Sequence, residues 1–306
     1  MAMGRNIRKV CVLKGGDSFE RDVSLMSAKG CVNAVQELGC EVCDFDFTGD
    51  IAALISHVKW EKPDCVFNAL YGGSGENGNI QSLLNFLKVP YSHSGVVASS
   101  VAMNKYISCE LFGSNGIRVP RSRLEKWTDF IKKPDFMCPF VIKPVDSGSS
   151  EGVYIINNYS ELSNIKWTYN DIVFVSEYIP GLELTTAVLN DEALEVTNII
   201  TTSGFYDYNN KYTDGGAVHE IPANIPDFVR HEAMSSALKA HKLLGCRCTS
   251  RSDFRYNDVT KELFLLEVNT QPGLTSLSLL PEQAKFVGIP FNKLIQYMIE
   301  QSTYDK

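Results

Sequence analysis

The sequence predicts a chain of mixed α/β and α+β class, with a parallel-sheet unit at its N-terminal end and strand-rich segments after it. Three observations lead to this prediction. Strand patterns alternate with helical stripes over about the first 95 residues, which is typical of a parallel sheet covered by helices. The middle segment has short β-branched runs joined by Gly/Ser turns. The last third contains a pair of strand patterns around a short polar turn.

The first unit is expected to alternate three strands with three helices. Apolar and β-branched runs predict the strands, and apolar residues at spacings of three and four predict the helices. Gly39 is expected to end the first helix. In order, the elements are a strand at 7–13, a helix burying Leu25, Ala28, Val32 and Val35, a strand at 41–47, a helix at 51–58, a strand at 64–70 and a helix burying Ile80, Leu83, Leu84 and Leu87.

The rest of the chain is expected to form strand pairs and one long helix. Strands at 139–143 and 153–156 flank a Gly/Ser turn and make a hairpin, and a further strand spans 173–179. Strands are also expected at 184–189, 194–200, 250–256 and 263–269. The helix carries Val229, Ala233, Ala237, Ala240 and Leu244 on one face, with Gly245 as a C-cap. Residues 204–220 show little periodicity and are predicted to be a mobile loop.

Composition and net charge exclude several classes of binding partner. The chain has 306 residues, 44% of them hydrophobic, and a formal net charge of −7. This length supports a core large enough to fold without disulfides. The negative charge argues against sequence-independent binding to nucleic acid or to an acidic membrane. The apolar runs are too short for a transmembrane helix, and the first one stops at Lys14, too early for a secretory signal. We therefore expect a cytoplasmic protein with no nucleic-acid or membrane partner.

Nine cysteines are scattered along the chain, and one pair, Cys40 and Cys43, has CxxC spacing. A redox pair or half of a zinc site is one interpretation of that spacing. Cys43, however, alternates with acidic residues like the apolar face of a strand, and Cys246 and Cys248 have no histidine nearby at zinc-finger spacing. The sequence therefore favours buried, reduced thiols.

The strongest chemical pattern lies in the last predicted pair of strands. Arg251, Asp253 and Arg255 alternate along one strand and project from one face, and Glu267 and Asn269 do the same on its partner. Two carboxylates and a carboxamide offer hard oxygen ligands, which suit Mg²⁺. The alternative is a cross-strand salt bridge in which Arg251 or Arg255 neutralises the acids.

Two further segments are typical of anion-binding loops. Lys143 ends an apolar strand pattern and precedes the Gly/Ser turn at 148–152, whose N–H groups and hydroxyls suit a phosphate. Gly15-Gly16 leads from the first strand to the first helix, at the sheet edge where ligands usually bind. The alternatives are an ordinary turn at 148–152 and, for Ser18, a role as helix N-cap or first-turn residue. The chain has no Walker A motif.

Six segments, taken in order, resemble the D-alanine–D-alanine ligase family of the ATP-grasp superfold. They are GGDSFERDVSL at 15–25, GENGNIQ at 75–81, Lys143-Pro144 with GSS at 148–150, RSDFR at 251–255, EVNTQPG at 267–273 and TSLSLLP at 275–281. The resemblance implies a Rossmann-like substrate domain at 1–96 and a two-lobed ATP-grasp unit at 97–180 and 181–306, with a lid loop near 204–220.

The resemblance implies an ATP-dependent ligase that joins two D-alanines through an acyl phosphate, giving D-alanyl-D-alanine for peptidoglycan. Asp253, Glu267 and Asn269 would hold two Mg²⁺ ions, with Mn²⁺ as a substitute. Residues matching the family's ATP contacts are Lys105, Lys143, Ser150, Glu177, Tyr178, Ile179, Glu183 and Lys211. A homodimer is implied by analogy with the family.

Substrate roles also follow from the resemblance. Glu20 would bind the ammonium of the first D-alanine and be linked through Ser149 to Tyr212. Arg251 and the backbone N–H of Gly273 would form the oxyanion hole. The carboxylate of the second D-alanine would bind at Ser278 and Leu279.

The chain departs from the family pattern at four positions, with Tyr71 for His, Asn77 for Asp, His93 for Gly and Asn104 for Asp. These departures bear on the affinity for the second substrate and on its pH dependence. The pair Lys211-Tyr212 resembles the branch that uses D-alanine as second substrate. Two alternatives stay open: another carboxylate–amine or depsipeptide ligase of the same superfold, and a nucleotide-binding regulatory protein without catalysis.

Overall fold

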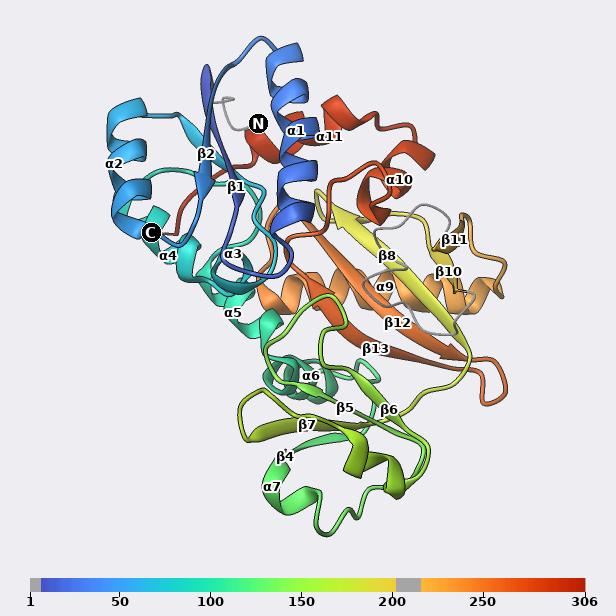
Figure 1. Ribbon diagram of the computed structural model, residues 1–306. Coiled ribbons are helices and arrows are strands. Elements are labelled where there is room, and N and C mark those ends of the chain that lie inside the picture. Colours follow the sequence, from blue (N-terminus) through green and yellow to red (C-terminus); the bar gives the residue numbers. More distant parts are fainter. Residues whose placement is uncertain (1–6, 202–215, 306) are drawn as a thin grey trace.

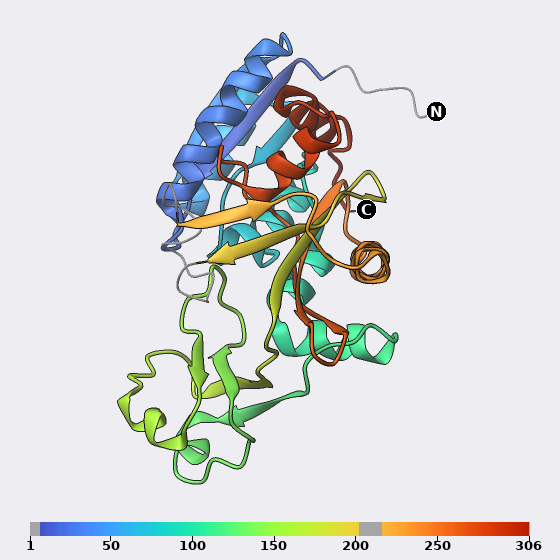
Figure 2. The ribbon, with the colours of Figure 1, turned by 90° about the vertical axis from the view of Figure 1, so that its right-hand side faces the viewer.

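The computed structural model describes residues 7–201 and 216–305, which form three sheets (Figure 1). A three-stranded sheet with its helices lies at one end of the molecule and a four-stranded sheet at the other. A larger sheet lies between them, and the turned view in Figure 2 shows the same order. The predicted mixed α/β and α+β class is therefore confirmed.

The first sheet has the strand order β2-β1-β3, and all its pairs are parallel. The first unit consists of β1 (Lys9–Gly15), α1 (Arg21–Glu37), β2 (Glu41–Phe47), α2 (Ile51–Glu61), β3 (Cys65–Asn68), α3 (Gly73–Glu76) and α4 (Asn79–Leu87). Helices cover both faces, because β1 buries Val10 and Val12 on the α1 side and Cys11 and Leu13 on the α2 and α4 side.

The predicted strand–helix alternation of this unit is confirmed, with one correction to the buried face of α1. Ala28 and Val35 are buried as expected, but Leu25 and Val32 are only partly buried. Val23 and Cys31 take their places in the core. Helix α11 packs on α1 as well, a contact that the local pattern of α1 does not predict.

The second sheet is antiparallel, with the order β4-β7-β5-β6. The predicted hairpin is confirmed as the pair β5 and β6. The elements here are β4 (Ser122–Lys126), α7 (Trp127–Phe130), β5 (Phe140–Pro144), β6 (Tyr154–Ile156), the 3₁₀ helix η1 (Tyr159–Asn164) and β7 (Ile172–Glu177). An aromatic cluster of Phe130, Phe136 and Phe140 forms its core, with ring centroids 5.8 Å apart in two of the pairs.

The third sheet has the order β11-β10-β8-β12-β13, and β9 pairs with β8. Its elements are β8 (Leu182–Leu189), β9 (Glu192–Ala193), β10 (Thr197–Thr201), β11 (Ala217–Glu220), α9 (Asp227–Leu244), β12 (Thr249–Asn257) and β13 (Glu262–Asn269). The small residues Ala233, Ala237 and Ala240 let α9 approach the sheet, and Gly245 ends the helix at a φ of 70°. Residues 217–220, predicted as loop, form a strand because they pair with β10.

Local patterns did not predict the short helices α3, α7 and η1, nor four longer ones: α5 (Val96–Met103), α6 (Lys105–Ser114), α10 (Leu279–Phe286) and α11 (Phe291–Glu300). Helix α11 buries Leu294, Ile295 and Met298 in the core of the first unit. Figure 2 shows the red C-terminal helices beside the blue α1. Residues near the end of the chain therefore complete the N-terminal core.

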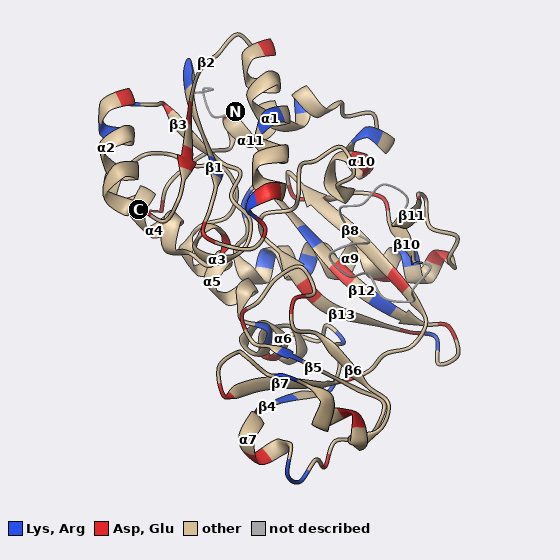
Figure 3. Cartoon of the chain, viewed as in Figure 1, with Lys and Arg blue, Asp and Glu red and all other residues tan. Residues whose placement is uncertain are grey.

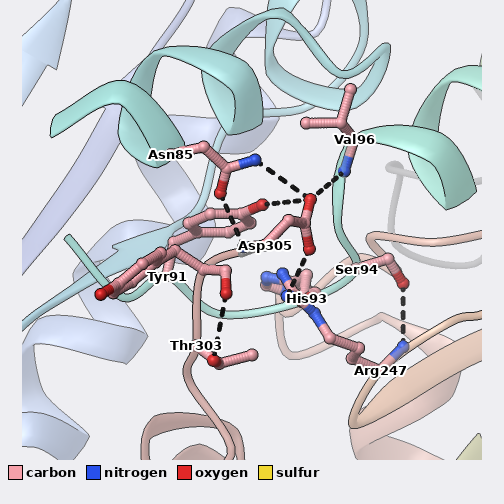
Figure 4. A network of polar contacts seen from close by, with 9 residues as sticks. Asn85, Tyr91, His93, Ser94, Val96, Arg247, Thr303 and Asp305 are labelled. Carbon is pink, nitrogen blue, oxygen red and sulfur yellow. Dashed lines mark hydrogen bonds and ion pairs between the residues drawn. The ribbon is translucent and has the colours of Figure 1, made fainter. Parts of the chain in front are cut away.

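Asp305 anchors the C-terminal segment that follows α11 (Figure 4). Its carboxylate accepts hydrogen bonds from Asn85 Nδ2 at 3.0 Å, the Val96 backbone N–H at 3.1 Å and the Tyr91 hydroxyl at 3.3 Å. It also pairs with Arg247 at 2.9 Å. Arg247 lies just before β12, so this one carboxylate ties the first unit to the third sheet.

Charged positions of both signs are spread over the molecule, including the strands of the third sheet (Figure 3). Among the described residues, no helix combines the length and the apolar character that crossing a membrane requires.

Candidate active site

The loop after β1 carries Glu20, whose side chain is 4% exposed. The Glu20 carboxylate accepts a hydrogen bond from the Ser149 hydroxyl, on the turn after β5. The Ser18 hydroxyl accepts from the Glu20 N–H at 3.1 Å and donates to the Tyr71 carbonyl at 2.6 Å. Glu20 itself occupies the N-cap position of α1, so Ser18 is a loop residue and not the cap. A Cβ at Gly72 would lie 2.6 Å from Glu20 Oε2, which explains the glycine there.

Glu20 forms one wall of a hollow of about 580 Å³. Seven of the predicted site residues line it: Glu20, Ser149, Arg251, Asn269, Gly273, Ser278 and Leu279. They come from the first unit, the second sheet and the third sheet with its following helix. The structure therefore brings together residues separated by up to 259 positions in sequence, from Glu20 to Leu279.

The N-terminus of α10 lies at the wall of this hollow. Ser278 is its N-cap residue and Leu279 its first residue, and first-turn N–H groups lack intrahelical partners. The Ser278 hydroxyl accepts a hydrogen bond from the Thr275 N–H at 3.0 Å and contacts Thr275 Oγ1 at 2.8 Å. A Cβ at Gly273 would lie 2.7 Å from Ser278 Oγ, so the glycine allows this close approach.

Glu76 also lines the hollow, and the sequence analysis gave it no role. Desolvation raises the pKa of its carboxyl to about 8, with the Glu20 carboxylate as the next cause. Proximity of two acids favours the protonated form of one of them. The sequence did mark Glu76 as a candidate site residue, because it lies in the segment 75–81 that resembles the family motif.

The acidic pair on β12 and β13 depends on a β-bulge. Asp253 lies opposite Glu267 and Arg251 lies opposite Asn269, with a register shift between Asp253 and Phe254. A regular ladder from the turn would place Asp253 opposite residue 266 and turn Glu267 to the other face. The extra residue in β13 brings both acids to one side of the sheet.

Asp253 accepts hydrogen bonds from three side chains. Arg251 binds it twice, at 2.9 and 2.8 Å, Asn269 Nδ2 at 2.9 Å and Thr185 Oγ1 at 2.7 Å. The predicted salt bridge therefore exists, but along one strand and not across two. The carboxylate oxygens of Asp253 and Glu267 and the amide oxygen of Asn269 are still hard ligands of the kind that Mg²⁺ prefers. Since the present donors use the lone pairs of Asp253, one contact would have to move when a cation binds.

A second hollow of about 940 Å³ adjoins the first and shares Gly148 with it. Its lining includes nine predicted ATP or metal residues: Lys105, Lys143, Ser150, Glu177, Tyr178, Ile179, Glu183, Asp253 and Glu267. At one end Arg255 pairs with Glu183 at 3.2 Å and donates to the Ile179 carbonyl at 3.1 Å. This contact fixes the strand segment that forms the wall of the hollow.

The two lysines are held in different ways. Lys105 is the first residue of α6 and is 7% exposed, and its Nζ donates to the Ser147 carbonyl. Lys143 on β5 has its Nζ 5.4 Å from the centroid of the Phe174 ring. Asn104 caps α6 by accepting the Ile107 N–H at 3.0 Å, so it performs the capping task that an Asp would perform there.

The departure at His93 has a local explanation. Its φ of 69° lies in the left-handed region, where a glycine meets no strain. The ring is 3% exposed, contacts Ser92 Oγ through Nδ1 at 2.8 Å, and lies edge-on to Phe67. Burial lowers the pKa of His93 to about 3, so the imidazole is neutral near pH 7. His93 therefore adds no charge near the site. Lys211 and Tyr212 lie outside the described residues.

The hollow lined by Lys105, Lys143, Asp253 and Glu267 adjoins the hollow lined by Glu20, Asn269 and the start of α10. This arrangement, on one parallel and two antiparallel sheets, agrees with the ATP-dependent ligase of the ATP-grasp class that the sequence resemblance implies.

Comparisons with known proteins give the family. A family model described as "D-ala D-ala ligase C-terminus" matches residues 120–300. The chain is 45% identical over 304 residues to a D-alanine–D-alanine ligase of Caulobacter vibrioides, covering 96% of this chain and 93% of that protein. It is 46% identical over 305 residues to that of Granulibacter bethesdensis, covering 97% and 99%. A crystal structure of the Bacillus anthracis ligase complexed with ATP superposes with a TM-score of 0.81, at 30% identity and 97% coverage of both chains. The chain belongs to the D-alanine–D-alanine ligase family.

Proposed function

We propose that this protein joins two D-alanine molecules, converting ATP to ADP and phosphate and giving D-alanyl-D-alanine for peptidoglycan synthesis. One observation carries the proposal: the two hollows meet at Gly148, so a carboxylate held in the first lies beside a phosphate chain held in the second. A shared wall of this kind suits phosphoryl transfer from nucleotide to amino acid.

In this proposal the second hollow binds ATP and neutralises its negative charge. A carboxylate is a poor electrophile, so the γ-phosphate of ATP converts the carboxylate of the first D-alanine into an acyl phosphate. The phosphates are contacted by Lys105, Lys143 and Ser150, and in this proposal also by Lys211. The positive charges of the lysines offset the negative charge of the phosphates. Adenine and ribose bind along Glu177, Tyr178, Ile179 and Glu183.

Asp253, Glu267 and Asn269 would hold two Mg²⁺ ions, or Mn²⁺ in their place, which would neutralise the phosphate oxygens and align them. The proposal rests on the donor chemistry of these three side chains and on their position between the two hollows.

The first hollow binds and orients the two D-alanine molecules. Glu20 pairs with the ammonium of the first D-alanine, and Ser149, linked in the proposal to Tyr212, holds Glu20 in place. The carboxylate of the second D-alanine binds at the N-terminus of α10, at Ser278 and Leu279.

The second amine then attacks the acyl carbon. Arg251 and the Gly273 N–H stabilise the oxyanion that forms there, and collapse of the intermediate expels phosphate. Holding the amine at near-attack distance and excluding water prevents hydrolysis of the acyl phosphate.

We also propose a cytoplasmic location, since ATP and D-alanine are cytoplasmic substrates of the family's reaction, and a homodimer by analogy with the family. Gel filtration with light scattering would test the dimer.

The purified chain, with ATP and Mg²⁺, tests the activity. D-Alanine should drive ADP and phosphate release in equal amounts, and mass spectrometry should detect the dipeptide. L-Alanine is the matched control, because it has the same groups in the opposite configuration. Release of ADP that is independent of D-alanine, or equal with L-alanine, would contradict the proposal.

A further inference from the structure

Three metal-ligating side chains meet on the first sheet, away from the two hollows. Cys11 comes from β1, Cys43 from β2 and His57 from α2. Their ligand atoms, the two Sγ atoms and an imidazole nitrogen, lie within 4.8 Å of one another. None of the three lines either hollow described above.

Strand register and helix packing create this cluster. Cys11 and Cys43 are direct partners in the parallel ladder of β1 and β2, so their side chains point to the same face. Helix α2 covers that face with Leu54 and Val58, and His57 lies between them in sequence. The Phe45 ring stacks at a tilt on His57, with centroids 4.8 Å apart, which fixes the imidazole over the sheet.

One possible ligand atom of the cluster lacks a partner in the described part of the protein. His57 Nε2 is buried and has no hydrogen-bond partner among the residues that the structure describes. A buried polar atom without a partner is costly and requires an explanation.

We propose that Cys11, Cys43 and His57 bind a thiophilic d¹⁰ cation, Zn²⁺, as a second metal site chemically distinct from the oxygen-lined cleft. Two thiolates and one imidazole are typical zinc ligands, at about 2.3 Å for sulfur and about 2.0 Å for nitrogen. Hard cations such as Mg²⁺ prefer oxygen, so the two sites discriminate between metals.

The fourth position is open to water, since Cys43 and His57 are both only partly buried. Glu61 lies one helical turn beyond His57 but is engaged by Lys9 at 2.7 Å. With tetrahedral bonds of the lengths above, the ligand atoms would stand about 3.5–3.8 Å apart, so separations that now lie within 4.8 Å need contract by no more than about 1.3 Å. The metal would tie α2 to β1 and β2 and stabilise the first unit.

Cobalt and zinc titrations of the reduced full-length chain test the site. Co²⁺ should give thiolate-to-cobalt charge-transfer absorption that saturates at one equivalent and is displaced by Zn²⁺. Cys43→Ser and His57→Gln should each weaken Zn²⁺ binding by more than about 100-fold, since losing even an outer partner of a ligand costs about 10–100-fold. Both side chains are partly exposed, so both variants should fold, as circular dichroism would verify.

Cys40→Ser is the matched control. Cys40 completes the CxxC spacing with Cys43, but its Sγ contacts the Ile7 carbonyl at 3.5 Å and is not in the cluster. This variant should bind Zn²⁺ like the wild type, and D-alanine-dependent ADP release should be unchanged in all three variants. The proposal is overturned by wild-type binding no tighter than that of Cys43→Ser, by binding that is insensitive to His57→Gln, or by loss of binding in Cys40→Ser.

Discussion

Replacing Gly273 with alanine perturbs the proposed binding site of the second D-alanine and leaves the nucleotide site unchanged. The new Cβ would lie 2.7 Å from Ser278 Oγ, closer than real Cβ contacts, and 3.5 Å from Ser278 Cβ. The backbone N–H of residue 273 is kept, so the oxyanion donor is not removed. The Ser278 hydroxyl must therefore move, and the perturbation is confined to the start of α10.

The magnitude follows from the contacts that Ser278 would lose. Its hydroxyl accepts the Thr275 N–H at 3.0 Å and contacts Thr275 Oγ1 at 2.8 Å. At about 0.5–1.5 kcal/mol for each bond, displacing the hydroxyl costs about 1–3 kcal/mol. If that cost falls on binding of the second carboxylate, kcat/KM for the second D-alanine should fall between about 5-fold and 150-fold.

Initial rates of ADP release over a wide D-alanine range measure this loss, with ATP saturating. The weaker of the two D-alanine phases should shift to higher concentration, while KM for ATP should stay within about twofold. Gly30→Ala is the matched control, because Gly30 lies in α1, away from the site, and its Cβ would make an ordinary contact of 3.5 Å with Phe291 of α11.

Unchanged kinetics for the second D-alanine in Gly273→Ala would refute this reasoning, since Ser278 would then play no part in binding. A loss confined to ATP affinity would refute it as well, because that result would assign the start of α10 to the nucleotide.

Three further predictions follow. Glu267→Gln should lower kcat by at least about 100-fold while changing the free energy of unfolding by less than about 1 kcal/mol, because the carboxylate acts on charge that develops in the transition state. Glu76 has a folded pKa of about 8 against an ordinary 4.5, so the folded state holds its proton in this window and stability should fall as pH rises from 5 to 8. Asp305→Asn removes the ion pair with Arg247 and should cost about 1–2 kcal/mol.

Each prediction has a direct measurement. Steady-state ADP release with urea unfolding separates activity from stability in Glu267→Gln, and retained turnover would exclude this residue from the metal site. Urea unfolding from pH 5 to 8 should give a flatter profile for Glu76→Gln, and parallel profiles would contradict the raised pKa. Thermal unfolding tests Asp305→Asn against Asp258→Asn, a change in an exposed turn, and equal midpoints would contradict the anchoring role.

Elements with a strong period of their own were predictable from sequence. The alternation of the first unit, the β5–β6 hairpin and α9 with its Gly245 cap all depend on local patterns and local turns. Helices α5, α6, α10 and α11 were missed because their apolar residues pack against other units. Leu294 and Met298 of α11, for example, complete a core that starts nearly 290 residues earlier.

The site residues were named from motifs, but their assembly was not predictable from local sequence. Glu20 meets Ser149 only because the turn between β5 and β6 reaches the loop after β1. Gln271 shows the same limit: it bonds Asn68 at 3.0 Å and the Leu70 carbonyl, joining β3 to the loop after β13. Contacts between units are set by packing, which no spacing along the chain records.

Strand register separates what spacing can predict from what it cannot. On β12 and β13 a short turn limits the register, so alternation alone placed Asp253 and Glu267 near each other. The single extra residue of the bulge then decides that they share a face. For Cys11 and Cys43 the strands are parallel and joined through α1, so no turn sets their register. The CxxC spacing pointed from Cys43 to Cys40, whereas the ladder pairs it with a cysteine 32 positions earlier. A metal site of this kind becomes visible only once the register of a parallel pair is known.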